Sequence, residues 1–168
     1  RLIVESVDRV APTLARSFPQ CDVIATKQDN KLDWVRDLKD VDYFALIADL
    51  QRLFRRRPED FPLHSGYFVP DPARVSHWQA QLDALDQRRR PRIGISWRGG
   101  VELTRKTVRS MAVTEMHALT EAIDATWVNL QYGDVAADLE SAAAAGMEIA
   151  NWPGAIKDLD EFSALIGA

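Results

Sequence analysis

Short strand-like runs that alternate with helical patterns constrain the fold of this chain most. Leu2 to Glu5 is an apolar run typical of a buried strand, and Asp22 to Ala25 is another. Between them lies an amphipathic helix pattern that includes Leu14, with Asp8 as its expected cap. Strand, helix and strand within about 25 residues predict a parallel sheet of the α/β class.

A proline-rich stretch interrupts this alternation. Tyr43 to Ala48 is a weaker candidate for a third strand, and three prolines follow it before residue 71. We therefore expect residues 1–70 to form part of one α/β half. Asp71 and Pro72 then predict the start of a linking helix over residues 71–90, with the Asp as cap and the Pro in the first turn.

The alternation restarts beyond residue 90, which predicts a second α/β half over residues 91–168. Its strands are expected at Arg92 to Trp97, Trp127 to Leu130 and Met147 to Ala150, and its helices at Thr114 to Ala122, Val135 to Ala145 and from Asp158 onward. Leu2 to Glu5 and Arg92 to Trp97 should be central strands of two separate sheets. The predicted architecture is two incomplete Rossmann-like parallel-sheet halves joined by a helix.

Composition and charge narrow the functional classes. The 168 residues are 46% hydrophobic, which suffices for a core, and 21 Lys and Arg nearly balance 25 Asp and Glu, so no overall field recruits nucleic acid. Cys21 is the only cysteine and no spacing is typical of a metal site, so a reducing, cytoplasmic location fits best. No apolar run reaches the roughly 20 residues of a membrane span.

A glycine pair and a cluster of cations follow the strand at Arg92 to Trp97. Gly99 and Gly100 let the backbone turn and come close to a ligand. The neighbouring polar residues are Arg98, Arg105, Lys106, Arg109 and Ser110. In open α/β sheets ligands bind outside the carboxyl ends of the strands, so we expect an anion site here, for a phosphate. The alternative is a turn in a solvated basic loop.

The end of the next strand carries a second group of candidates. Gln131 can hydrogen-bond a base or ribose, and Gly133 can let the chain pass close beneath it. A plain strand end followed by a turn is an equally good interpretation. Trp97 and Trp127 are interpreted as core residues in preference to stacking platforms.

Candidates for a catalytic acid or base are few. His64 lies in the proline-rich stretch, where a base can reach a cleft between the halves, whereas His77 and His117 fall on helix surfaces. Asp49 and Asp60 are acids without a visible partner, and Arg55 to Arg57 is interpreted as a solvated surface run. No catalytic residue is assigned.

Six short motifs in a fixed order are more specific than any one of them. They are Arg16 to Pro19, Asp71-Pro72 with Trp78, Ile93 to Gly100, Arg109-Ser110, Val128 to Gly133 and Asp158 to Ile166. In this order the chain resembles the glycosyltransferase-like region that follows tetratricopeptide repeats in many bacterial proteins. That region is related to heptosyltransferases and, more distantly, to O-linked N-acetylglucosamine transferase. The match covers nearly the whole chain.

The resemblance implies a GT-B architecture, in which two Rossmann-like halves face a cleft and the second half holds a nucleotide-sugar. Trp97 to Gly100 would form the first loop of that donor half and Gln131 to Gly133 the second, while Arg109 would stand where heptosyltransferases carry a phosphate-binding lysine. Fixed cations and helix amides would then stabilise the leaving diphosphate without a metal. The acceptor, a protein or a glycan, stays open.

Members of that family extend beyond both ends of this chain, so the resemblance also implies the middle piece of a longer transferase. The leading expectation is transfer of a sugar from a nucleotide-sugar donor to an unknown acceptor. One rival is a binding module on a degenerate transferase fold, which holds a nucleotide or a protein partner without turnover. The other rival is a structural fragment without a ligand.

Overall fold

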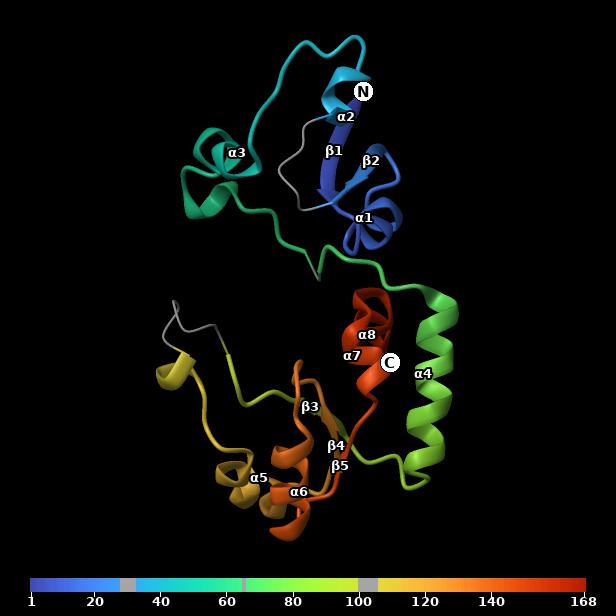
Figure 1. The fold of residues 1–168 in the computed structure, drawn as a ribbon, viewed down its shortest axis with the longest axis vertical. Helices are drawn as coiled ribbons and strands as arrows, with labels where there is room; N and C mark the ends of the chain where they lie inside the picture. The colour runs from blue at the N-terminus through green and yellow to red at the C-terminus, as the bar shows by residue number, and fades with distance from the viewer. Residues whose placement is uncertain (28–32, 65, 100–105) are drawn as a thin grey trace. The chain divides into compact units, whose positions relative to one another are not determined.

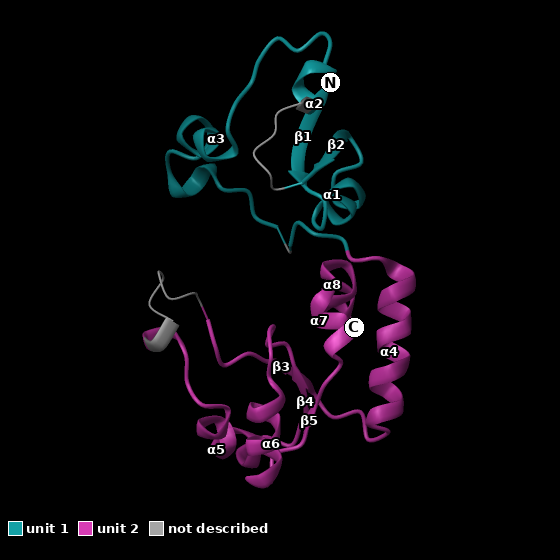
Figure 2. Ribbon diagram, in the orientation of Figure 1, with its two compact units in different colours: residues 1–69 teal, residues 70–168 magenta. Residues whose placement is uncertain are grey.

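A computed structural model describes residues 1–27, 33–64, 66–99 and 106–168. The chain divides into two compact units, residues 1–69 and residues 70–168 (Figure 2). In its described part each unit combines a small parallel sheet with helices. The chain is therefore of the mixed α/β class.

The first unit begins with β1 (Leu2–Val7), α1 (Ala11–Ser17) and β2 (Cys21–Thr26) (Figure 1). The two strands pair in parallel, which confirms the predicted strand, helix and strand. The predicted cap is wrong, because the Asp8 carboxylate accepts a hydrogen bond from the backbone N–H of Arg9 instead. The helix begins later, with Pro12 in its first turn.

Beyond β2 the described part of the first unit contains α2 (Asp33–Arg36), α3 (Ile47–Phe54) and η1, a 3-10 turn over Pro58–Asp60. The strand predicted at Tyr43 to Ala48 is wrong, since the backbone is irregular up to Leu46 and then helical. Tyr43 is 92% exposed, so nothing packs on it as it would on a buried strand. The apolar side chains of α3 recur at helical spacing instead.

The second unit contains α4 (Pro72–Leu85), β3 (Arg92–Ile95), η3 (Lys106–Arg109), η4 (Val113–Met116), α5 (His117–Ala122), β4 (Thr126–Asn129), α6 (Ala136–Ala144), β5 (Ile149–Ala150), α7 (Pro153–Lys157) and α8 (Leu159–Gly167). Its strands are parallel and lie in the order β3, β4, β5 (Figure 1). β1 and β3 thus belong to separate sheets, as predicted. Neither is a central strand, because β3 pairs with β4 alone among the described strands and β1 belongs to a two-stranded sheet.

Helix starts in the second unit follow the predicted chemistry. The Asp71 carboxylate accepts hydrogen bonds from the backbone N–H groups of Ala73 and Arg74, and α4 begins directly after it. Asp158 caps α8 in the same way. Within the second unit α4 packs against α8 (Figure 1). Among the described residues, no helix combines the length and the apolar character needed to cross a membrane.

The core of the second unit lies on both faces of its sheet. Neighbouring residues of a strand point to opposite faces, so Trp127 and Val128 of β4 enter different clusters. The Trp127 cluster includes Ile95, Trp97, Val113, Val135, Ala142 and Met147, and the Val128 cluster includes Trp78, Leu82, Ala155, Ala164 and Leu165. Packing on both faces fixes the positions of the strand ends. Trp97 and Trp127 are core residues, as predicted.

Candidate functional site

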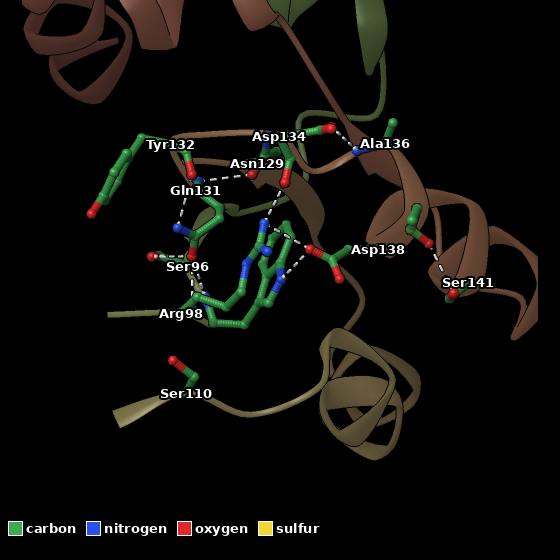
Figure 3. Close-up of polar contacts among 12 residues, drawn as sticks. Ser96, Arg98, Ser110, Asn129, Gln131, Tyr132, Asp134, Ala136, Asp138 and Ser141 are labelled. Carbon is green, nitrogen blue, oxygen red and sulfur yellow. Dashed lines mark hydrogen bonds and ion pairs between the residues drawn. The ribbon is translucent and has the colours of Figure 1, made fainter. Parts of the chain in front are cut away.

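The candidate site lies at the carboxyl edge of the three-stranded sheet. Because the three strands are parallel, the segments that follow them meet at one edge. These segments are Ser96 to Gly99 after β3, Leu130 to Gly133 after β4 and Asn151 after β5. The predicted phosphate loop and the second predicted loop are therefore neighbours (Figure 3).

The side chain of Gln131 joins these two loops. It is 3% exposed, and its Oε1 accepts hydrogen bonds from the backbone N–H groups of Trp97 at 3.1 Å and Arg98 at 2.7 Å and from the Ser96 hydroxyl at 3.0 Å (Figure 3). Its Nε2 donates to the carbonyl oxygen of Tyr132 at 3.1 Å. Both ends of the amide thus bind within the protein, which makes Gln131 an organiser of the loops.

Two asparagines continue this polar network across the sheet. Asn129 is 1% exposed, and its side-chain oxygen accepts a hydrogen bond from the backbone N–H of Gln131 at 2.8 Å. Its Nδ2 donates to the side-chain oxygen of Asn151 at 2.8 Å. Sequence reasoning missed both residues. An amide at the end of a buried apolar strand was the available signal, because a buried polar group needs a partner.

Trp97 and Arg98 bind the first turn of α6. The indole N–H of Trp97 donates to Asp138 Oδ2 at 3.1 Å, and Nη2 of Arg98 lies 2.9 Å from the same oxygen. Nη2 of Arg98 also donates to the carbonyl oxygen of Asp134 at 2.6 Å (Figure 3). Arg98 is therefore paired with an internal carboxylate. Asp138 is a further residue that the sequence analysis missed.

The end of η3 lies beside the loop after β3. The backbone N–H of Gly99 donates to the Ser110 hydroxyl at 3.3 Å, and the N–H of Met111 donates to the carbonyl oxygen of Trp97 at 2.9 Å. A Cβ on Gly99 would lie 3.4 Å from the carbonyl oxygen of Arg109, so the two backbones approach closely. The structure thus brings Gly99, Arg109 and Ser110 together, with Arg109 on the surface.

Only some of the remaining predicted site residues lie in the described part of the chain. Gly100 and Arg105 lie outside the described residues, and Lys106 is described only as the first backbone position of η3. Gly133 has a φ of +91°, a conformation that favours glycine, and it follows an exposed Tyr132. The turn after β4 therefore needs its glycine whether or not a ligand passes there.

The other sequence candidates have contacts within their own segments of the chain. The ring of His64 lies against Tyr67 in the first unit, and Asp60 accepts hydrogen bonds from the backbone N–H groups of Arg56 and Arg57. His117 on α5 lies 3.5 Å from Glu121. These contacts are local and exposed, and none of them includes a residue of the Gln131 network.

Two cavities flank the sheet of the second unit. One of about 640 Å³ opens beside Asn151, and its lining includes Arg74, His77, Trp78, Trp152 and Glu161. Another of about 930 Å³ lies at the amino ends of β4 and β5, lined by residues 123–127 and 145–150 among others. Groups of three or more metal-ligating side chains are not found in the described ranges.

The chain is 31% identical over 173 residues to Protein FlbA of Caulobacter vibrioides. The alignment covers 95% of this chain and 28% of FlbA, so the chain spans little more than a quarter of that relative's length. No family model matches the chain, and no solved structure matches it. The function is therefore argued from the geometry of the site.

Proposed function

We propose that the carboxyl edge of the three-stranded sheet binds the phosphate end of a nucleotide-sugar, and that the chain is the donor-binding part of a glycosyltransferase with GT-B architecture. One observation carries the proposal: Gly99 lies beside the backbone of Arg109 and the hydroxyl of Ser110 at the carboxyl ends of parallel strands. Ligands of open α/β sheets bind at this edge. The sugar acceptor is a separate, unidentified molecule.

The chemistry of these three groups suits a phosphate. Arg109 is an exposed guanidinium at the end of η3, and a guanidinium binds phosphate oxygens in bidentate fashion. Gly99 has no side chain to keep a ligand from the backbone, and the Ser110 hydroxyl is a neutral donor. A nucleoside diphosphate leaves a sugar with growing negative charge, which a fixed cation stabilises. On this proposal the reaction needs no metal.

Titration calorimetry on the chain tests the binding step. Nucleoside diphosphates should bind more tightly than the matching nucleosides, with or without EDTA, because the phosphates supply charge-assisted hydrogen bonds. Arg109→Ala should remove about 1.5 to 3 kcal/mol of that difference. The control is Arg55→Ala, an exposed arginine of the first unit near the Phe61 ring, which should change nothing. Equal affinities for nucleoside and diphosphate would contradict the proposal.

A binding module without turnover is the second candidate. It is favoured by the internal use of the loop amides, since the N–H groups of Trp97 and Arg98 both donate to Gln131 and are not free for a transition state. Incubation with nucleotide-sugars separates the two functions. With a cell extract added as the source of acceptor, release of free nucleotide from a bound nucleotide-sugar supports the transferase, whereas binding with no release over hours supports the module.

A further inference from the structure

An acidic side chain sits within the cationic part of the candidate site. Asp138 is the third residue of α6, and its side chain is 30% exposed. One of its oxygens, Oδ2, accepts a hydrogen bond from the indole N–H of Trp97 and forms an ion pair with the guanidinium of Arg98. A single carboxylate oxygen thus holds two consecutive residues of the loop that leads to Gly99 (Figure 3).

The guanidinium of Arg98 is incompletely bonded in this position. Its Nη2 donates a hydrogen bond to the carbonyl oxygen of Asp134 and forms an ion pair with Asp138 Oδ2, yet its Nε is buried and has no hydrogen-bond partner among the described residues. A donor left without an acceptor is unfavourable. The attraction of Asp138 therefore holds the Arg98 side chain in a position where the Nε of Arg98 makes no hydrogen bond.

Arg109 is in a different electrostatic situation. It lies on the surface at the end of η3, and within the described ranges no carboxylate forms an ion pair with it. The two arginines flank the same glycine-bearing loop, but only the charge of Arg98 is balanced internally. A Cβ on Gly99 would lie 4.0 Å from the Cβ of Arg109, so an anion at Gly99 is within reach of a charge that no carboxylate balances among the described residues. Arg98 with Asp138 contributes only a small residual charge.

We infer that Asp138 determines how much phosphate charge the site accepts: it neutralises Arg98, so that Arg98 positions the loop and Arg109 binds the anion. The inference rests on the proposed function and adds a specificity-determining residue to it. Asp138→Asn keeps the shape and an oxygen acceptor for the Trp97 indole but removes the charge. The charge of Arg98 then acts on the ligand.

A double-mutant cycle with calorimetry tests this inference on the chain. Asp138→Asn should bind a nucleoside diphosphate about three- to tenfold more tightly than the wild type, with a smaller gain for the monophosphate and a steeper loss with added salt. Arg98→Gln alone gives the reference affinity of a chain that has lost the loop contacts of Arg98. In the Asp138→Asn background the same change should remove the gain.

Glu140→Gln is the matched control, because Glu140 is an exposed acid two residues further along α6. It removes an equal charge and should leave the affinity within about twofold of the wild type. Unchanged or weaker binding by Asp138→Asn, or an equal gain from Asp138→Asn in the Arg98→Gln background, would each overturn the inference. A wild-type chain without any preference for the diphosphate overturns the proposed function and this inference with it.

Discussion

The two edges of the three-stranded sheet are each organised by one buried acceptor side chain, and the two acceptors differ in charge. At the amino edge, Asp86 is 6% exposed and accepts hydrogen bonds from the Thr126 hydroxyl at 2.7 Å and from Nε of Arg90 at 3.0 Å. The backbone N–H groups of Arg88 and Arg90 add two more. At the carboxyl edge the neutral amide of Gln131 accepts three.

This difference shows what each edge needs. The hydrogen bond from Thr126, followed by those from Arg90, holds the pKa of the Asp86 carboxyl well below its usual range, so the carboxylate is charged. Directly after α4, it binds β4 and the turn that leads to β3. A carboxylate at position 131 would still accept hydrogen bonds from the loop after β3, but it would lose the bond to the Tyr132 carbonyl and would repel a phosphate. A neutral acceptor organises the proposed binding edge without opposing its ligand.

The largest effect is expected from Asp86→Asn. Losing the charge weakens four hydrogen bonds at once, so the melting temperature at pH 7 should fall more than for any other variant discussed below. A carboxyl whose folded pKa is lowered adds stability above its unfolded pKa, about 3.9, and loses it as the pH falls further. The gap between wild type and variant should therefore narrow below about pH 4 in thermal melts. A gap that stays constant down to pH 3 would contradict this account.

Gln131→Met comes next, because methionine fills similar space and accepts no strong hydrogen bond. The N–H groups of Trp97 and Arg98 then lack an acceptor, at about 1 to 3 kcal/mol for each buried group. Chemical denaturation measures this loss. Gln131→Glu keeps an acceptor, so it should stay closer to wild-type stability yet bind a nucleoside diphosphate more weakly. If the two variants had equal effects on stability and on nucleoside diphosphate binding, the charge of the acceptor at the carboxyl edge would not matter and the distinction between the two edges would be lost.

Two glycines, one near each edge of the sheet, extend the comparison, with smaller expected losses of folding stability. Gly133 follows β4 at the carboxyl edge with φ +91°, and Gly146 follows α6 toward the amino end of β5 with φ +84°. A Cβ would meet nothing within 4 Å at either position, so an alanine is opposed by backbone strain alone, about 1 kcal/mol in each case. Denaturation should show similar losses for Gly133→Ala and Gly146→Ala. Only Gly133→Ala should weaken nucleotide binding, and a matching loss in Gly146→Ala would argue against a localised site.

Much of the fold could be predicted because local patterns encode it. The alternation of strands and helices, the Asp71 and Asp158 caps and the burial of Trp97 and Trp127 all follow from spacing or from single-residue preferences. The strand expected at Tyr43 to Ala48 failed because an apolar run this short fits a strand or a helix equally well. Tertiary packing decides between them.

For the candidate site, the sequence could predict which loops are neighbours but not which side chains bind one another. Strand order puts the loops after β3 and β4 together, so the predicted residues Gly99 and Gln131 meet at one edge of the sheet. The partner of each polar side chain depends on residues more than 30 positions away, as in the pairs Trp97 with Gln131 and Arg98 with Asp138. No spacing rule reaches that far. Arg98 was therefore expected as a ligand cation, whereas the structure pairs it internally.

The smallest effect is expected from Asp124→Asn at the amino edge. Asp124 Oδ1 lies 3.2 Å from Nη1 of Arg90, a distance typical of an ion pair, yet the Asp124 side chain is 75% exposed. Water screens such a pair, and many exposed ion pairs contribute nothing measurable. Asp86 raises the pKa of Arg90 more than Asp124 does, so the arginine keeps its main partner in the variant. Thermal melts of Asp124→Asn should match the wild type from pH 5 to 8. A clear fall in melting temperature would mean that Asp86, Arg90 and Asp124 act as one coupled network. The amino edge would then owe its stability to three charges, and its contrast with Gln131 would rest on more than a single acceptor.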